Sequence, residues 1–330
     1  MHPVGQSAPL SGASPPSAVP ASRGRAPLRA AAAAVAAVAA FLVAYFALGS
    51  ALSHRIDDDP DFAPPAPVAG GSRAIDMAAA LIEREVVLHS WQPNDPWFLP
   101  NGLLDNTPSF QSGIKDALAR FAFELVDQLG RTRGSSRADP DLERAGGLLQ
   151  FPSGIWYFDF RKSLLPVIPS EGQFRAAREA LLAYNGRLAR NAAVYDRRTD
   201  SLAAAIDRIA VDLGSQSGLI DQHLRTESGG WPLNPEADDL FYHTKGRLYA
   251  YFLLLREVGH DFEPVIQAGN LGQVWEQAMA SLREGSLLQP WVVLDGSPEA
   301  GLFASHIASQ GFFLKRALVQ LREMSDGLVN

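Results

Sequence analysis

Cysteine is absent from this chain of 330 residues. Its absence excludes disulfide bonds, cysteine-ligated zinc, iron–sulfur clusters and thiol nucleophiles. A strongly basic composition is also missing, since the formal net charge is −7, whereas nucleic-acid-binding domains normally carry a clear positive excess. The glycine patterns of nucleotide-binding loops and the G-x-S-x-G elbow of serine hydrolases do not occur either. We therefore predict no cofactor and no nucleic-acid partner.

Charge is missing altogether from residues 30–52, a run of 23 residues dominated by alanine, with Phe41, Leu42, Val43, Tyr45 and Phe46 in its second half. As a helix this run would be about 34 Å long, enough to cross a hydrocarbon core of about 30 Å. A cleaved signal peptide ending near Gly49-Ser50-Ala51 is the alternative, although its apolar region is usually only about 7–15 residues long. We predict an uncleaved transmembrane helix over residues 30–52 that contacts the lipid bilayer.

The two flanks of this run differ in charge. Arg23, Arg25 and Arg29 precede it without any acidic residue, whereas aspartates dominate the residues that follow. The positive-inside rule then leaves the N-terminus in the cytoplasm and places the rest of the chain across the membrane. The sequence thus predicts a single-pass protein of the bacterial inner membrane with a periplasmic C-terminal domain.

Proline separates the chain into regions, because ten of the 23 prolines precede residue 70. Residues 1–29 are rich in Pro, Ser, Gly and Ala and are predicted to form a disordered cytoplasmic tail. Residues 53–71, SHRIDDDPDFAPPAPVAGG, are predicted to form an acidic stalk that separates the domain from the bilayer. Anionic headgroups would repel its aspartates, so the domain is expected to stand off the surface.

Helical periodicity dominates residues 72–330. Ser72 is a suitable N-cap for a helix that reaches about residue 89, and similar patterns predict helices near 114–129, 139–149, 240–258, 265–284 and 300–325. The segments 155–160 and 291–294 are the strand-like pieces, and both are short. The predicted fold class is all-α, with one N-terminal transmembrane helix followed by an extracytoplasmic multi-helix domain.

Residues 170–231 contain no proline and are dense in Ala, Leu and Arg. Apolar residues at helical spacing run through most of this stretch. One long central helix is a possible interpretation, and a helical hairpin broken near Asp196–Asp200 is the other. Both interpretations keep the domain all-α.

Aromatic residues stand beside prolines in three segments between helices, 91–108, 151–169 and 289–298. Trp91, Trp97, Trp156 and Trp291 are interpreted as loop anchors that bury their rings against the helices. A groove for a ligand or partner is the alternative interpretation.

Four sequence blocks resemble an uncharacterised family of bacterial single-pass inner-membrane proteins known as a domain of unknown function. The blocks are NDPWFLPNGLLDN (94–106), RTRGSSRADPDLERAGGLLQFP (131–152), ADDLFYHTKGRLYAYFLLLRE (237–257) and QPWVVLDG (289–296). The resemblance covers residues from about 72 to the end. It implies a membrane-anchored, largely helical envelope protein and transfers no functional residue.

Glu227-Ser228 is the one candidate for catalysis. The segment 227–237 looks like the glutamate-serine motif of lytic transglycosylases, in which a glutamic acid protonates the glycosidic oxygen of peptidoglycan. The glycine- and glutamine-containing part of that family's pattern is missing downstream. A polar loop is the simpler interpretation, with Asn234 capping the next helix and Pro235 at its first position.

Two pairs of residues have the spacing of metal ligands on one helix face, Glu85 with His89 and Asp239 with His243. Neither belongs to an HExxH motif or to a di-iron pattern, so ion pairs or capping contacts are the preferred interpretation. The sequence as a whole favours a non-catalytic interaction or scaffold protein whose partners are envelope proteins or peptidoglycan. The alternative is a lytic-transglycosylase-like enzyme that uses Glu227.

Overall fold

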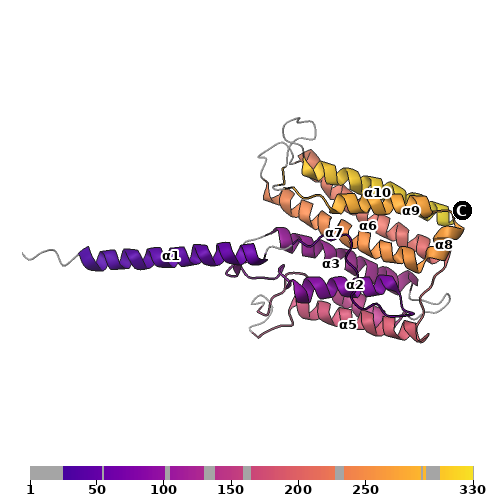
Figure 1. The fold of residues 1–330 in the computed structure, drawn as a ribbon, viewed down its shortest axis with the longest axis horizontal. Coiled ribbons are helices and arrows are strands. Elements are labelled where there is room, and N and C mark those ends of the chain that lie inside the picture. The colour runs from indigo at the N-terminus through magenta and orange to yellow at the C-terminus, as the bar shows by residue number, and fades with distance from the viewer. Residues whose placement is uncertain are drawn as a thin grey trace, which may run out of the picture. The chain divides into compact units, whose positions relative to one another are not determined.

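The computed structural model describes residues 25–53, 56–100, 105–129, 138–158, 165–226, 234–290, 293–294 and 305–329. The chain divides into two compact units, residues 1–47 and 48–330. Every regular element in the described ranges is helical (Figure 1). The predicted all-α class is confirmed, and the described residues of the two strand-like pieces, 155–158 and 293–294, form no strand.

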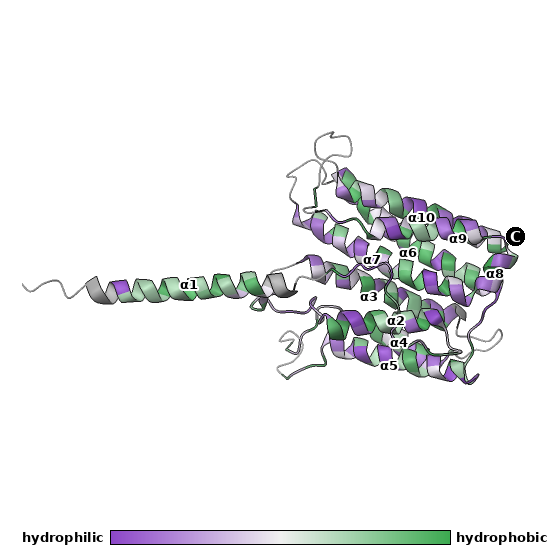
Figure 2. Ribbon diagram, viewed as in Figure 1, coloured by the Kyte–Doolittle hydropathy of each residue, from purple (hydrophilic) through white to green (hydrophobic). Residues whose placement is uncertain are grey.

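The first helix, α1 (Arg25–Ser53), contains the charge-free run. Its window from Arg29 to Gly49 has a mean hydropathy of 2.4, and none of that window is buried. Figure 2 shows apolar colours along most of this helix. It is long and apolar enough to cross a membrane, and a signal sequence near the N-terminus can meet the same criteria of length and composition.

The second unit is a bundle of helices. They are α2 (Arg73–Glu83), α3 (Asn106–Glu124), α4 (Pro140–Leu149), α5 (Ser170–Ala189), α6 (Thr199–Thr226), α7 (Pro235–Asp261), α8 (Glu263–Ala268), α9 (Gly272–Ser286) and α10 (His306–Val329). Two of them end in a π-helical turn, α2 in Arg84–Leu88 and α3 in Leu125–Leu129.

Local chemistry explains where several helices begin. The Ser72 hydroxyl accepts a hydrogen bond from the Ile75 amide at 3.3 Å, which confirms Ser72 as the N-cap of α2. The Asn234 side chain accepts from the Glu236 amide at 3.1 Å and Pro235 opens α7, also as predicted. Asp139 caps α4 in the same way, with Pro140 at its first position.

Helix α7 lies at the centre of the bundle. It packs against α2, α3 and α9, while α10 packs against α6 and α9, and α5 packs against α2 and α4 (Figure 1). Phe241, Tyr249 and Tyr251 of α7 are fully enclosed. Because it is covered on several sides, α7 can present polar groups to the interior only if each finds a partner.

The proline-free stretch 170–231 breaks into two helices. Helix α5 ends at Ala189, Asn191 adopts a positive φ of 56°, and α6 begins at Thr199. The Asp196 carboxylate accepts hydrogen bonds from Arg198 and Ser201, which stabilises the connection. Of the two interpretations left open, the single long helix is wrong, and the chain breaks between Ala189 and Thr199, next to the position given for the hairpin. Helix α5 packs on α2 and α4 while α6 packs on α10, so the two helices belong to different parts of the bundle.

Candidate functional site

Residues 56–71, part of the segment predicted to be an acidic stalk, are bound along α7. We call this segment the strap. One carboxylate and three carbonyl oxygens of the strap accept hydrogen bonds from α7 side chains. The pairs are Asp58 with Lys245, Asp59 with Tyr249, and both Pro60 and Phe62 with Arg256, each at 2.7 Å. The strap thus follows α7 from near its middle toward its C-terminal end.

Lys245 is the most deeply enclosed charge of this contact, with 1% of its side chain exposed. Its ammonium group donates to the Asp58 carboxylate and to the carbonyl oxygens of Ser286 and Leu288, so all three donors are used. Gln289 donates to the same carboxylate. Burial lowers the pKa of Lys245, and Asp58 opposes that effect. A buried pair of this kind stabilises one position of the strap, because any shift would leave a charge unpaired.

A second cation holds the beginning of the strap. The guanidinium of Arg84 lies 4.4 Å from the centre of the Phe62 ring and 3.4 Å from the Asp57 carboxylate. It also donates to the Tyr249 hydroxyl at 2.8 Å. Asp57 and Asp58 therefore find cations on the π-helical turn after α2 and on α7, and these pairs help to hold the strap on the bundle.

The metal candidates Glu85 and His89 do come close together. The Glu85 carboxylate lies 3.7 Å from Nδ1 of His89, and the Asp57 carboxylate lies 3.6 Å from Nε2. These two nitrogens point to opposite sides of the imidazole ring, so one ion could not bind both carboxylates together with this ring. Glu85 also accepts from Arg84 at 2.7 Å. The arrangement is that of a histidine between two carboxylates, beside a fixed cation.

Asp239 and His243 each bind a different residue of α3. The Asp239 carboxylate accepts from the Ser109 hydroxyl at 2.8 Å, and Nε2 of His243 lies 3.0 Å from the Asp116 carboxylate. Burial raises the pKa of Asp239, and Asp105 adds to the effect. These contacts join α3 to α7. In the described ranges, no group of three or more His, Asp or Glu side chains has the geometry of a metal site.

Glu227, the catalytic candidate, lies outside the described residues, as do Trp231 and Trp291. Trp91 and Trp97 differ in how far their rings are exposed to solvent. Trp91 is buried and its indole donates to the Ser153 carbonyl at 2.9 Å, as expected of a loop anchor, whereas 76% of Trp97 is exposed. The anchor interpretation is correct for Trp91 and wrong for Trp97.

A cavity of about 900 Å³ lies where the strap meets the start of α2 and the end of α7. Its charged lining was not singled out by any sequence motif. The lining residues with charged or titratable side chains are Arg73, Asp76, Arg197, Glu257, His260, Asp261 and Glu263.

The acidic groups of this cavity are held in place by the bundle. Asp261 accepts from the Ser72 hydroxyl and from the amides of Arg73 and Ala74, so it occupies the N-terminal end of α2, where an anion would otherwise bind. The Glu257 carboxylate lies 2.7 Å from Nε of Arg73. The lining therefore holds more carboxylates than arginines, and both Glu257 and Asp261 already have partners within the bundle.

Asp76 is the cavity residue whose protonation is most affected by its surroundings. Burial raises its pKa, although it accepts hydrogen bonds from the Val68 amide at 2.7 Å and from Asn185 at 2.8 Å. These two bonds tie the end of the strap to α2 and α5. Asp76 therefore helps to shape the cavity. The strap's apolar residues, Ile56 and Phe62, were the feature of the sequence that could have revealed its packing.

Comparison with known proteins places part of this chain in a family context. Residues 68–228, just under half of the chain, match the model of a family described as "Uncharacterized protein conserved in bacteria (DUF2333)". The predicted resemblance to an uncharacterised bacterial family is thus confirmed, with blocks 94–106 and 131–152 inside the match and blocks 237–257 and 289–296 beyond its end. No curated protein and no solved structure matches the chain.

Proposed function

We propose that this protein is a non-catalytic interaction or scaffold module anchored in the bacterial inner membrane by α1, with its helical bundle in the periplasm. The observation that carries the proposal is the apolar window from Arg29 to Gly49, none of which is buried. An apolar helix of this length needs an apolar environment, and a bilayer supplies it. The +3 charge before the charge-free run 30–52 supports a cytoplasmic N-terminus.

The contact between the strap and α7 supports the scaffold role. Only residues 54–57 separate the end of α1 from Asp58, which is paired with Lys245 inside the bundle. The strap therefore belongs to the bundle, and only a short connection remains between it and α1. The partners proposed for the bundle are envelope proteins or peptidoglycan.

Topology is tested with reporters fused to the C-terminus of the full chain. An alkaline phosphatase fusion should be active and a green fluorescent protein fusion dark, because the first folds only outside the cytoplasm and the second only inside. The reverse result would overturn the proposal. A shortened chain, cleaved near Ala51, would show that α1 acts as a signal peptide instead of an anchor.

Catalysis is tested separately with the same full chain on a peptidoglycan gel. The scaffold proposal predicts no cleared zone, together with partners recovered by crosslinking in intact cells. Clearing by the natural chain that is lost in Glu227→Gln would contradict it and would support the lytic alternative.

A further inference from the structure

Two loops at one end of the bundle expose a group of large apolar side chains. We call these residues the aromatic patch: Trp97, Phe98, Tyr157, Phe158, Leu165 and Ile168. Trp97 is 76% exposed and Leu165 is 73% exposed. Single exposed apolar residues are common on soluble proteins, but contiguous groups of this kind mark a surface that binds something.

The patch is held together by hydrogen bonds and ring contacts between its two loops. The Asn94 side chain donates to the Ile155 carbonyl at 2.9 Å, and the rings of Phe98 and Trp156 are 5.8 Å apart. Within the second loop, the Val167 amide donates to the Tyr157 carbonyl at 2.9 Å. The exposed rings therefore belong to loops whose backbone is held by hydrogen bonds and ring contacts.

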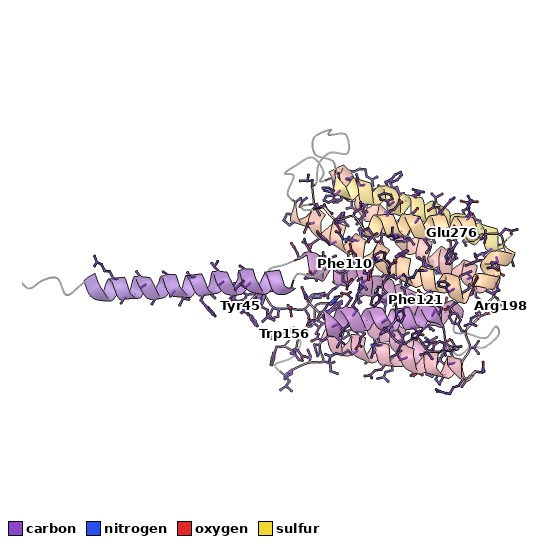
Figure 3. The ribbon with its side chains drawn as sticks, in the orientation of Figure 1. Tyr45, Phe110, Phe121, Trp156, Arg198 and Glu276 are labelled. Carbon is purple, nitrogen blue, oxygen red and sulfur yellow. The ribbon has the colours of Figure 1, made fainter. Side chains whose placement is uncertain are left out.

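The patch lies at the same end of the bundle as the beginning of the strap. Asp57 contacts Arg84, the first residue of the π-helical turn that follows α2, and His89, just after that turn. The chain that follows His89 forms the first loop of the patch. Figure 3 shows Trp156 at this end of the bundle and Arg198 at the opposite end. From Ser53, the last residue of α1, to Asp58 the chain spans at most about 18 Å.

Two of the acidic side chains at this end are paired with cations. The sequence alone suggested that the aspartates of residues 57–61 would be repelled by anionic headgroups. However, Asp58 is neutralised by Lys245 at 2.7 Å, and Asp57 lies 3.4 Å from Arg84. These two pairs reduce the electrostatic reason for the bundle to stand off a membrane, while Asp59 and Asp61 stay exposed to solvent.

We infer that the aromatic patch docks on the lipid surface and inserts its rings at the headgroup level of the bilayer. Tryptophan and tyrosine are the residues that membrane proteins concentrate at this depth, because their rings are apolar with a polar edge. The inference rests on the proposed membrane anchor, since the short chain from Ser53 to Asp58 limits how far this end of the bundle can lie from the bilayer. The bundle then has a defined orientation on the membrane.

The absence of cysteine makes a direct test possible, because a single introduced thiol is the only labelling site in the chain. Trp97→Cys and Leu165→Cys report on the two loops of the patch. Val38→Cys reports on the middle of α1, and Phe312→Cys, at a 61% exposed position on α10, is the matched control. Each full-length variant is labelled at its thiol with an environment-sensitive fluorophore and reconstituted in vesicles of phosphatidylethanolamine and phosphatidylglycerol. The vesicles also contain lipids that carry a nitroxide, either in the headgroup or in the acyl chain. The nitroxide quenches fluorophores that lie at its own depth.

Docking predicts that headgroup-depth nitroxide removes most of the emission at Trp97 and Leu165 and little at Phe312, while acyl-depth nitroxide quenches Val38. Quenching at Val38 without quenching at the two patch positions would overturn docking and leave the anchor intact. Equal quenching at Phe312 would also overturn it, because the bundle would then have no preferred face. No quenching at Val38 would refute the anchor and docking together.

Discussion

Glu124 illustrates how burial changes the properties of a single residue. Its side chain is 1% exposed at the end of α3, and its carboxylate lies 2.8 Å from Nη2 of Arg120. Burial raises the pKa of Glu124 to about 7, although Arg120 and Arg208 act in the opposite direction. A glutamate that stays protonated near neutral pH in the folded state makes stability depend on pH.

We expect the free energy of unfolding to fall as pH rises from about 4.5 to about 7. In this window the unfolded chain loses the proton of residue 124 while the folded chain keeps it, which removes about 3 kcal/mol in total. Glu124→Gln should abolish this part of the fall. Urea unfolding of the full chain in detergent, at pH values on both sides of the window, measures it. The exposed Glu143→Gln variant is the control, and an unchanged slope in Glu124→Gln would contradict the expectation.

At the scale of elements, α3 and α7 approach each other closely enough for backbone contact. A Cβ at Gly246 would lie 2.0 Å from the Phe110 carbonyl oxygen, and one at Gly113 would lie 2.0 Å from the His243 carbonyl oxygen. The two glycines therefore form a reciprocal pair between the helices. Figure 3 shows Phe110 on α3 near this contact.

We expect Gly246→Ala to destabilise the bundle by about 3 kcal/mol, because the added methyl group must push two backbones apart. Gly218→Ala is the matched control in α6, where a Cβ meets nothing within 4 Å. That variant should stabilise the protein by about 1 kcal/mol, since alanine favours a helix interior. Thermal unfolding of both variants measures the difference, and a tolerated Gly246→Ala would refute the close approach.

The helices themselves were predictable, whereas their partners were not. Apolar spacing and the caps Ser72 and Asn234 are local features, so they identify α2 and α7 from the sequence. The separation of α5 from α6 depends on which helices offer complementary surfaces. Those surfaces come from α2, α4 and α10, which are distant along the chain.

At the scale of the whole molecule, the proposed function depends on α1 entering a membrane. Its alanine content makes the apolar driving force modest, so a single charge near its middle should have a large effect. Val38 is 59% exposed and lies near the centre of the apolar window.

We expect Val38→Arg to shift much of the protein out of the membrane fraction, since a central arginine costs about 3 kcal/mol on insertion. Val38→Leu is the control and should remain fully integrated. Carbonate extraction followed by immunoblotting measures the membrane-integrated fraction of each. Equal retention of both variants would argue against α1 as the spanning segment.

The candidate site was only partly predictable. The sequence suggested Glu85 with His89 and Asp239 with His243 as pairs, but it did not identify Asp57, Ser109 or Asp116 as their partners. These partners come from other elements, so no spacing rule along one helix can find them. The cavity beside Asp261 was missed for the same reason, because its lining joins the strap, α2 and the end of α7.

The sequence by itself determined the charge-free helix, the all-α class and several helix ends, because hydropathy, periodicity and capping act over a few neighbouring residues. Tertiary structure decided the rest. The aspartates after α1 suggested an acidic stalk by composition, and Arg84 and Lys245 hold Asp57 and Asp58 against the bundle. A charge is repelled or buried according to its partner, and only the folded chain brings a partner 187 residues away to within 2.7 Å of Asp58.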